Sequence, residues 1–322
     1  MKKIISSILC LIMLLACCLS IVSCGTSQKK ADDYATALAK IIDGDYEGAK
    51  ALFEQLGSYK DSAKYLENFY YMPTKIGFNL IDRAGTIDVL FNGMNLPLKE
   101  ISHREDMERT TEFEYDENGN IVKQIAIING EVSTYTYVYN EIGLYDYAHY
   151  VGADGSECTY DYTYNEKGYR ITETYSDSYE NSYVCSFTYD DNGNLTRMAY
   201  EVGDEVHSLD ITYTFDEKDN LTKKVCNYSD GVEEILEYTY DEKGREIKCV
   251  FEAYDDSVST FDYTYDDNGN LIKTVCTDSD GVRQTADYDY KLLYLPKGFT
   301  EGSYYFFSGY WTSTLSPIEY FQ

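Results

Sequence analysis

Cysteine, histidine and acidic side chains are the groups in this chain that most readily do chemistry, and their spacing assembles no site. Beyond the first 24 residues the cysteines are Cys158, Cys185, Cys226, Cys249 and Cys276. The three histidines are His103, His149 and His207. No CxxC motif and no neighbouring histidine pair provides metal ligands, and no histidine accompanies a serine or cysteine in a nucleophile motif. The sequence therefore predicts no metal, no cofactor and no enzyme.

Acidic pairs recur along the chain at regular intervals. Asp190-Asp191 and Asp266-Asp267 each precede Asn-Gly-Asn. A feature copied in every repeat is typical of a scaffold, whereas a glycosidase needs one unique carboxylate pair. The loops place oxygen side chains at alternating positions, as calcium loops do, but they lack the glutamate that closes such a loop. We expect ordinary turn chemistry, with structural calcium as the alternative.

The N-terminus has the pattern of a secretory signal. Lys2 and Lys3 precede an apolar run over residues 4–22, and the chain turns polar after Gly25. Residues 21–24, Ile-Val-Ser-Cys, resemble a bacterial lipobox. The resemblance implies that residues 1–23 are the signal peptide and that Cys24 carries the lipid, so that the protein is exported and lipid-anchored on the outer face of the cell membrane. An uncleaved anchor and a poorer lipobox ending at Cys17 are the alternatives.

Charge bears on the choice of partner. Loss of Lys2 and Lys3 with the signal moves the formal charge from −29 to about −31. Nucleic acid is therefore an unsuitable partner. Acidity also keeps the body away from anionic headgroups, which leaves the lipid as the source of membrane affinity. After a tether over residues 24–30 the mature chain begins its folded part.

Residues 31–71 are alanine-rich and have helical periodicity. Gly44, Tyr46, Ala49 and Phe53 resemble the second half of a tetratricopeptide motif, and a third short helix is expected over residues 61–70. Because one such unit cannot bury both of its faces, we expect it to pack on the neighbouring part of the chain instead of forming a peptide groove.

Thirty-six tyrosines indicate a repeat, and the repeat begins near Phe113. Every 24 to 26 residues an aromatic-x-aromatic pair precedes an acidic turn. We call the second aromatic of each pair the anchor; the anchors are Tyr115, Tyr139, Tyr164, Tyr189, Phe215, Tyr240, Tyr265 and Tyr290. Strict alternation of this kind predicts a half-buried β-strand.

Four residues after most anchors stands a glycine that suits a positive-φ turn position. These turn glycines are Gly119, Gly143, Gly168, Gly193, Gly244 and Gly269, and Asp219 replaces the glycine in one copy. A second strand follows each turn, for example over residues 221–228, so one repeat is one hairpin. Eleven residues after the anchors is an apolar column, Tyr150, Tyr175, Tyr200, Cys226, Phe251 and Cys276, which should face the same layer as the aromatic pairs.

Residues 189–195, Tyr-Asp-Asp-Asn-Gly-Asn-Leu, and their copies resemble the YD repeats of Rhs, wall-associated and teneurin-type proteins. The resemblance covers residues 111–293 and implies hairpins joined edge to edge in one large sheet. The chain departs from the family in lacking a long array and the toxin domain of Rhs proteins, so a toxin-encapsulating shell is not expected.

We therefore predict a mainly β fold, an extended and curved antiparallel meander of more than a dozen strands with a small N-terminal helical hairpin. Residues 72–110 supply leading strands. The helices should cover one edge of the sheet, and an aromatic cap over residues 294–322 the other. The five cysteines should be free thiols in the apolar layer, because strands two apart are separated by about 10 Å, beyond disulfide reach.

The tyrosine columns allow two interpretations. They are ladders that hold a thin sheet together, or they present rings on which sugars stack. The densest cluster, Tyr304, Tyr305, Tyr310 and Trp311, is either a cap or a ligand-binding platform. Our first hypothesis is a surface binding or adhesion lipoprotein for carbohydrate or cell-wall polymer. The alternative is an assembly protein that contacts another envelope protein through its helical hairpin and sheet edge. The sequence predicts no oligomeric state.

Overall fold

The structure is a computed structural model, and it describes residues 28–80, 84–104 and 107–295. These residues form two compact units. The helical unit contains residues 28–72 and 292–295, and the β unit contains the remaining described residues.

Three helices and their own apolar core form the helical unit. A helix over residues 28–42 is followed by α2 (Tyr46–Leu56) and α3 (Ser62–Leu66). Asp45 begins α2 as its N-cap, since its Oδ1 accepts a hydrogen bond from the main-chain N–H of Gly48 at 3.0 Å. The buried core consists of Tyr34, Ala37, Ala49, Phe53 and Leu56. Among the described residues no helix is long and apolar enough to cross a membrane.

The third helix is shorter than predicted, because the first strand already starts at Phe69. Phe53 stacks on Tyr65 with ring centres 4.9 Å apart, and Phe69 meets Tyr294 edge to face at 5.1 Å. Phe69 and Tyr70, which were predicted to be helical, therefore belong to β1, where Phe69 packs on Tyr294 at the end of the last strand.

Within the described ranges, eighteen strands make up one sheet. The leading strands are β1 (Phe69–Asn79), β2 (Ala84–Phe91) and β3 (Pro97–Arg104). The next are β4 (Glu108–Tyr115), β5 (Ile121–Ile128), β6 (Glu131–Tyr139), β7 (Tyr145–Val151), β8 (Glu157–Tyr164), β9 (Arg170–Asp177), β10 (Ser182–Tyr189) and β11 (Leu195–Val202). The last are β12 (Glu205–Phe215), β13 (Leu221–Tyr228), β14 (Glu233–Tyr240), β15 (Glu246–Glu252), β16 (Val258–Tyr265), β17 (Leu271–Thr277) and β18 (Arg283–Tyr294).

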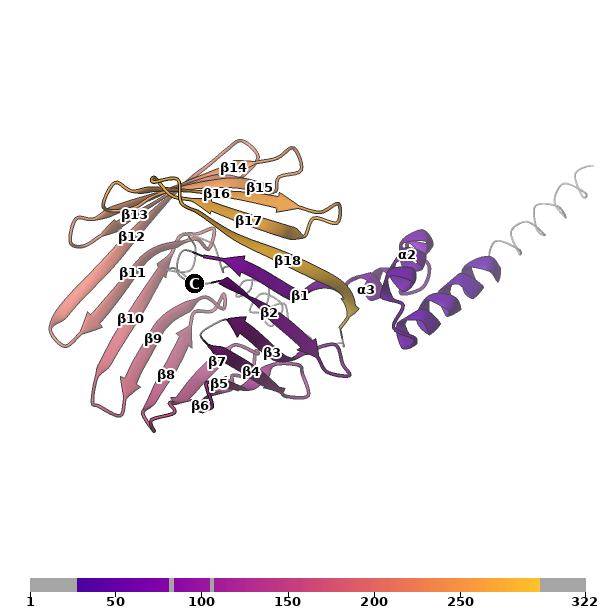
Figure 1. The fold of residues 1–322 in the computed structure, drawn as a ribbon, viewed down its shortest axis with the longest axis horizontal. Helices are drawn as coiled ribbons and strands as arrows, with labels where there is room; N and C mark the ends of the chain where they lie inside the picture. The colour runs from indigo at the N-terminus through magenta and orange to yellow at the C-terminus, as the bar shows by residue number, and fades with distance from the viewer. Residues whose placement is uncertain (1–27, 81–83, 105–106, 296–322) are drawn as a thin grey trace, which may run out of the picture. The chain divides into compact units, whose positions relative to one another are not determined.

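The sheet closes on itself. Each strand pairs with the strands before and after it in sequence, and β1 also pairs with β18 (Figure 1). Across this seam the hydroxyl of Thr74 donates to the main-chain carbonyl of Asp289 at 3.2 Å. The predicted open meander is therefore wrong, and so is the prediction that helices and tail cover two free edges. The fold is a closed 18-stranded antiparallel barrel.

A bulge in each repeat provides the physical reason for closure. The pairing register shifts at the anchor, for example between Thr188 and Tyr189 and again between Thr264 and Tyr265. Bulges bend the strand and increase its twist. Since the bend recurs at every second strand through the repeats, the sheet curls until β1 meets β18, and pairing of the two removes their unsatisfied main-chain groups.

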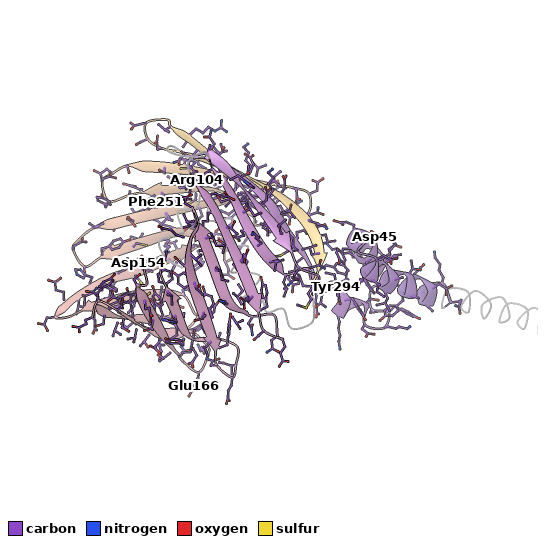
Figure 2. The ribbon with its side chains drawn as sticks, turned by 60° about the horizontal axis from the view of Figure 1, so that its bottom comes forward. Asp45, Arg104, Asp154, Glu166, Phe251 and Tyr294 are labelled. Atoms are coloured by element: carbon purple, nitrogen blue, oxygen red, sulfur yellow. The ribbon has the colours of Figure 1, made fainter. Side chains whose placement is uncertain are left out.

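Most details of the hairpin were predicted correctly. Seven anchors, Tyr115 through Tyr265, end their strands, and β13 has the predicted bounds. All six turn glycines have positive φ, and Asp219 adopts φ 62° in the place of the seventh. The eighth anchor differs, because Tyr290 lies inside β18 and no turn follows it. In Figure 2, Glu166 marks one such turn at the end of the β8–β9 hairpin.

Two turn glycines with nearly equal φ make a matched test of packing at the turns. A methyl group on Gly193 (φ 92°) would lie 2.3 Å from the hydroxyl oxygen of Tyr169, whereas one on Gly269 (φ 90°) would meet no atom within 4 Å. Gly269→Ala should lower the free energy of unfolding by about 1–2 kcal/mol through backbone strain alone. Gly193→Ala should lower it further, because Tyr169 must leave its stack on Tyr189. Urea unfolding measures both, and equal losses would contradict the proposed contact.

Candidate functional site: the aromatic lumen

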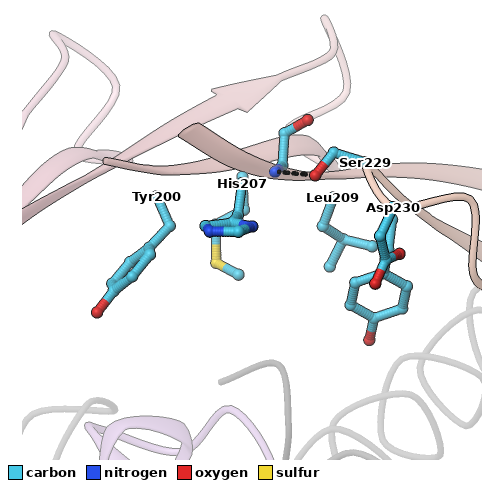
Figure 3. Close-up of a pocket in the computed structure, with 8 residues that line it drawn as sticks. Tyr200, His207, Leu209, Ser229 and Asp230 are labelled. Atoms are coloured by element: carbon cyan, nitrogen blue, oxygen red, sulfur yellow. Dashed lines mark hydrogen bonds between the residues drawn. The ribbon is translucent and has the colours of Figure 1, made fainter. Parts of the chain in front are cut away.

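Alternate residues of each strand face the interior and the exterior of the barrel. In β8, Cys158, Tyr160, Tyr162 and Tyr164 are buried or half-buried, whereas Asp161 between them is exposed. The less exposed, aromatic set is the luminal one. Figure 3 shows side chains of β11 and β12, among them Tyr200, His207 and Leu209, projecting from one side of the sheet.

The anchor tyrosines tie each hairpin to the one before it. The hydroxyl of Tyr189 donates to the main-chain carbonyl of Arg170 at 2.9 Å, 19 residues earlier. The same bond is made by Tyr115, Tyr139, Tyr164, Tyr240 and Tyr265. Where the anchor is Phe215, which has no hydroxyl, Tyr213 donates instead to the carbonyl of Leu195 at 2.7 Å. The anchor column is therefore part of the scaffold.

The acidic turns use their carboxylates on their own main chain. Asp190 Oδ1 accepts hydrogen bonds from the N–H groups of Asn192 and Asn194, at 3.0 and 2.8 Å, and its Oδ2 accepts from the Asn194 amide. These bonds lower the pKa of Asp190, first through the Asn194 side chain. Within the described ranges no group of three or more histidine, cysteine or acidic residues could hold a metal ion. The contacts favour turn chemistry over calcium binding.

Four tyrosines form a row of neighbouring rings across β8, β9, β10 and β11, in which Tyr175 and Tyr183 are stacked and the other two pairs are tilted. Ring centres are 5.2 Å apart from Tyr160 to Tyr175, 4.7 Å from Tyr175 to Tyr183 and 4.6 Å from Tyr183 to Tyr200. All four are half-buried. Tyr175 and Tyr200 belong to the column eleven residues after the anchors, and register confirms that this column faces the aromatic layer.

An ion pair adjoins the row. Arg170 Nη1 lies 2.9 Å from Glu173 Oε2, and the hydroxyl of Tyr183 donates to Glu173 Oε1 at 3.2 Å. The Arg170 guanidinium lies 4.5 Å from the ring centre of Phe187 and 5.7 Å from that of Tyr162. Sequence reasoning missed this pair. Glu173 could have been found, because it stands two residues before Tyr175 and so faces the same side of the strand.

Two cavities border Tyr200 of the row. A cavity of about 390 Å³ is lined by Arg170, Glu173, Tyr183, Phe187 and Tyr200, among others. A second cavity of about 190 Å³, drawn in Figure 3, shares Met198, Tyr200 and Leu209 with it. The row, the ion pair and the two cavities together are the candidate site.

The outer face of the barrel is charged. Acidic residues occupy outward positions near the middle of many strands, and cross-strand ion pairs connect them. The pairs include Lys99–Glu112, Arg197–Asp210, Lys223–Glu237 and Lys273–Asp287, at 2.6 to 3.3 Å. Such pairs are typical of a surface in contact with water.

The predicted free thiols are confirmed. All five cysteines are free and buried, and each lies on the luminal face of its strand. Burial raises the pKa of Cys185 and Cys226 to about 11 and that of Cys249 to about 12. The remaining predicted site residues, Cys24 and the cluster Tyr304, Tyr305, Tyr310 and Trp311, lie outside the described residues.

Comparisons with known proteins identify no family. No family model matches the chain, so the resemblance to YD and tetratricopeptide repeats is not confirmed. No curated protein matches it either.

Three solved structures share part of the arrangement. A porin-like protein from Bacteroides uniformis is 15% identical, with 68% of this chain and 96% of that chain covered and a TM-score of 0.41. A porin-like protein from Bacteroides vulgatus is 12% identical, with 68% and 99% covered and a TM-score of 0.35. A TcdB2–TccC3–Cdc42 complex is 15% identical, with 64% of this chain but 12% of that chain covered, at 0.31.

The turn carboxylates should make stability depend on acid. Because the folded-state pKa of Asp190 is lowered, its contribution to stability is complete above the unfolded pKa, about 4, and is lost as the pH falls through the folded value. Asp190→Asn keeps the accepting oxygen, as the native turn residues Asn140 and Asn165 do. Its stability deficit relative to the unmodified protein, measured by urea unfolding, should shrink between pH 6 and pH 3. Asp190→Ala should remain destabilised at both; a deficit of Asp190→Asn independent of pH would contradict the assignment.

The buried thiols should resist alkylation. At pH 8 a thiol with a pKa near 11 is about one part in a thousand thiolate, the reactive form. Residues 25–322, which retain five cysteines, should therefore react with a maleimide far more slowly when folded than in guanidinium, where all five should label. Rapid labelling of any of them in the folded protein, identified by peptide mass spectrometry, would place that thiol at the surface.

Proposed function

We propose that this protein is an exported, lipid-anchored and non-enzymatic binding protein whose lumen holds carbohydrate or cell-wall polymer. The observation that carries the proposal is the row of half-buried tyrosines beside open cavities. Ligand sites are concave, mostly apolar or aromatic, and contain a few placed polar groups. The row, with Arg170 and Glu173, fits that description.

The mixed lining of the larger cavity supports the proposal. Tyr183, Tyr189 and Tyr200 line it together with Arg170 and Glu173. The hydroxyl of Tyr189 donates to a main-chain carbonyl and that of Tyr183 to Glu173. A sugar has apolar C–H groups that pack against aromatic side chains and hydroxyls that bond to polar side chains.

The charged exterior supports a barrel that faces water. Barrels in lipid carry an apolar band outside and a polar interior, and a lysine or arginine facing lipid at mid-membrane costs about 2–4 kcal/mol. Here the distribution is reversed: the Arg197–Asp210 pair lies outside, and the tyrosine row lies inside. Membrane attachment would then come from a lipid on Cys24.

The alternative function, an assembly protein, required a free sheet edge and the helical hairpin as contact surfaces. Its sheet edge does not exist, because β1 pairs with β18. The helical unit remains a possible contact surface, since its Ile42 is 86% exposed. A single exposed apolar side chain is common on protein surfaces, so we rank this function second.

Binding assays with residues 25–322 test the proposal. The protein should bind at least one member of a panel of soluble glycans and insoluble wall polymers. Tyr200→Ala should weaken binding about tenfold, because an aromatic contact is worth about 1 kcal/mol beyond the area it buries. Tyr147→Ala is the matched control, since Tyr147 is half-buried on the outer face.

Two results would remove the proposal. One is the absence of binding to every glycan and wall fragment by protein that is folded by circular dichroism. The other is an equal loss of affinity in the Tyr147 and Tyr200 variants, which would show that the lumen is not the site.

A further inference from the structure

We propose that the ligand is an uncharged glycan that lies in the 390 Å³ cavity beside Tyr183 and Tyr200, with its hydroxyls on the Arg170–Glu173 pair. This inference rests on the proposed function and names the class of ligand and its subsite. It follows from the lining of the cavity, the chemistry of the pair and the charge around both.

The cavity lining indicates where a ligand lies. Tyr183 of β10 and Tyr200 of β11 line the cavity of about 390 Å³, together with Arg170 and Glu173 of β9. Tyr175 and Tyr183 stack on each other at 4.7 Å with an interplanar angle of 12°, so these two rings contact each other through their faces. A ligand in the cavity therefore packs against the free parts of Tyr183 and Tyr200 and lies beside the ion pair.

The Arg170–Glu173 pair offers a donor and an acceptor side by side. A guanidinium has five N–H donors and an ionised carboxylate about four acceptor positions. The hydrogen bonds described for the pair use Nη1 of Arg170 and one contact on each oxygen of Glu173, from Arg170 and Tyr183. Neighbouring sugar hydroxyls both donate and accept, so two of them match the pair.

The guanidinium is held in place before a ligand arrives. The rings of Phe187 and Tyr162 lie 4.5 and 5.7 Å from it, and Glu173 fixes Nη1. An arginine between two rings and a carboxylate loses little freedom on binding, which favours affinity. Phe187 and Glu173 also line the 390 Å³ cavity, so the donors of Arg170 border the open space.

Charge selects against an acidic ligand. The pair is neutral as a unit, and it sits in a chain of formal charge −29. A ligand carboxylate on the remaining donors of Arg170 would lie close to the carboxylate of Glu173, whose side chain is 18% exposed, and would be repelled by it. Like charge around the lumen adds to this cost. A glycan without carboxylates or phosphates avoids both.

Calorimetric titration of residues 25–322 at low salt tests the inference. The uncharged probes are cellohexaose, xylohexaose and chitohexaose, and the acidic probe is hexagalacturonate. At least one uncharged probe should bind, and hexagalacturonate should bind at least tenfold more weakly or not at all. Hexagalacturonate binding as tightly as the best uncharged probe would overturn the inference.

Glu173→Gln provides the decisive variant, and Asp210→Asn on the outer face is its control with the same change in net charge. Glu173→Gln leaves Arg170 without its carboxylate, so it should weaken the uncharged probe about tenfold and strengthen hexagalacturonate. Asp210→Asn should change neither affinity by more than about twofold. A role in folding alone would not reverse the preference for charge, and a thermal melt checks that both variants are folded.

The possible failures are distinguishable. If no probe and no wall polymer binds, both the proposed function and this inference are wrong. If an uncharged probe binds but Glu173→Gln behaves like Asp210→Asn, the lumen still binds glycan and only the assignment to Arg170 and Glu173 is wrong.

Discussion

The hydrogen bond from an anchor tyrosine to the main chain of the preceding hairpin is the interaction on which the rest of the structure depends. It joins positions 18 or 19 residues apart at every repeat, and it sits beside the bulge that bends the sheet. The copy with Phe215 shows that the bond itself is maintained, because Tyr213 supplies the missing hydroxyl. Tyrosine dominates the composition because the fold uses both its ring and its hydroxyl.

Closure of the sheet gives the two faces of each strand different environments, the barrel interior and the exterior. In β8, one face carries Cys158 and three tyrosines, and the other carries threonine and acidic residues; β10 and β16 likewise have aromatic residues on one face and hydroxyl-bearing or acidic residues on the other. In an open sheet both faces would meet water. Closing the ring gives the aromatic face an interior of its own, and the candidate site exists because of that interior and not because of any single motif.

Local features were predictable from the sequence, and the closure was not. The positive φ of Gly193, the bounds of β13 and the burial of Cys226 follow from the spacing of residues within one repeat. The pairing of β1 with β18 depends on the sum of small bends over many strands, which no single repeat records. The position of Arg170 could not be predicted for a similar reason. The register shift between Thr163 and Tyr164 interrupts the strict alternation, so alternation alone does not tell which face of the sheet Arg170 lies on.

The even number of strands has a consequence for how such a chain can change in length. In a closed ring where every neighbour is antiparallel, adding or removing one strand would force two parallel neighbours together, so the ring can grow or shrink only by whole hairpins. Duplication or loss of one unit of 24 to 26 residues satisfies this parity. The diameter of a barrel increases with its strand number. Each duplication or loss of a repeat would therefore change the width of the barrel interior.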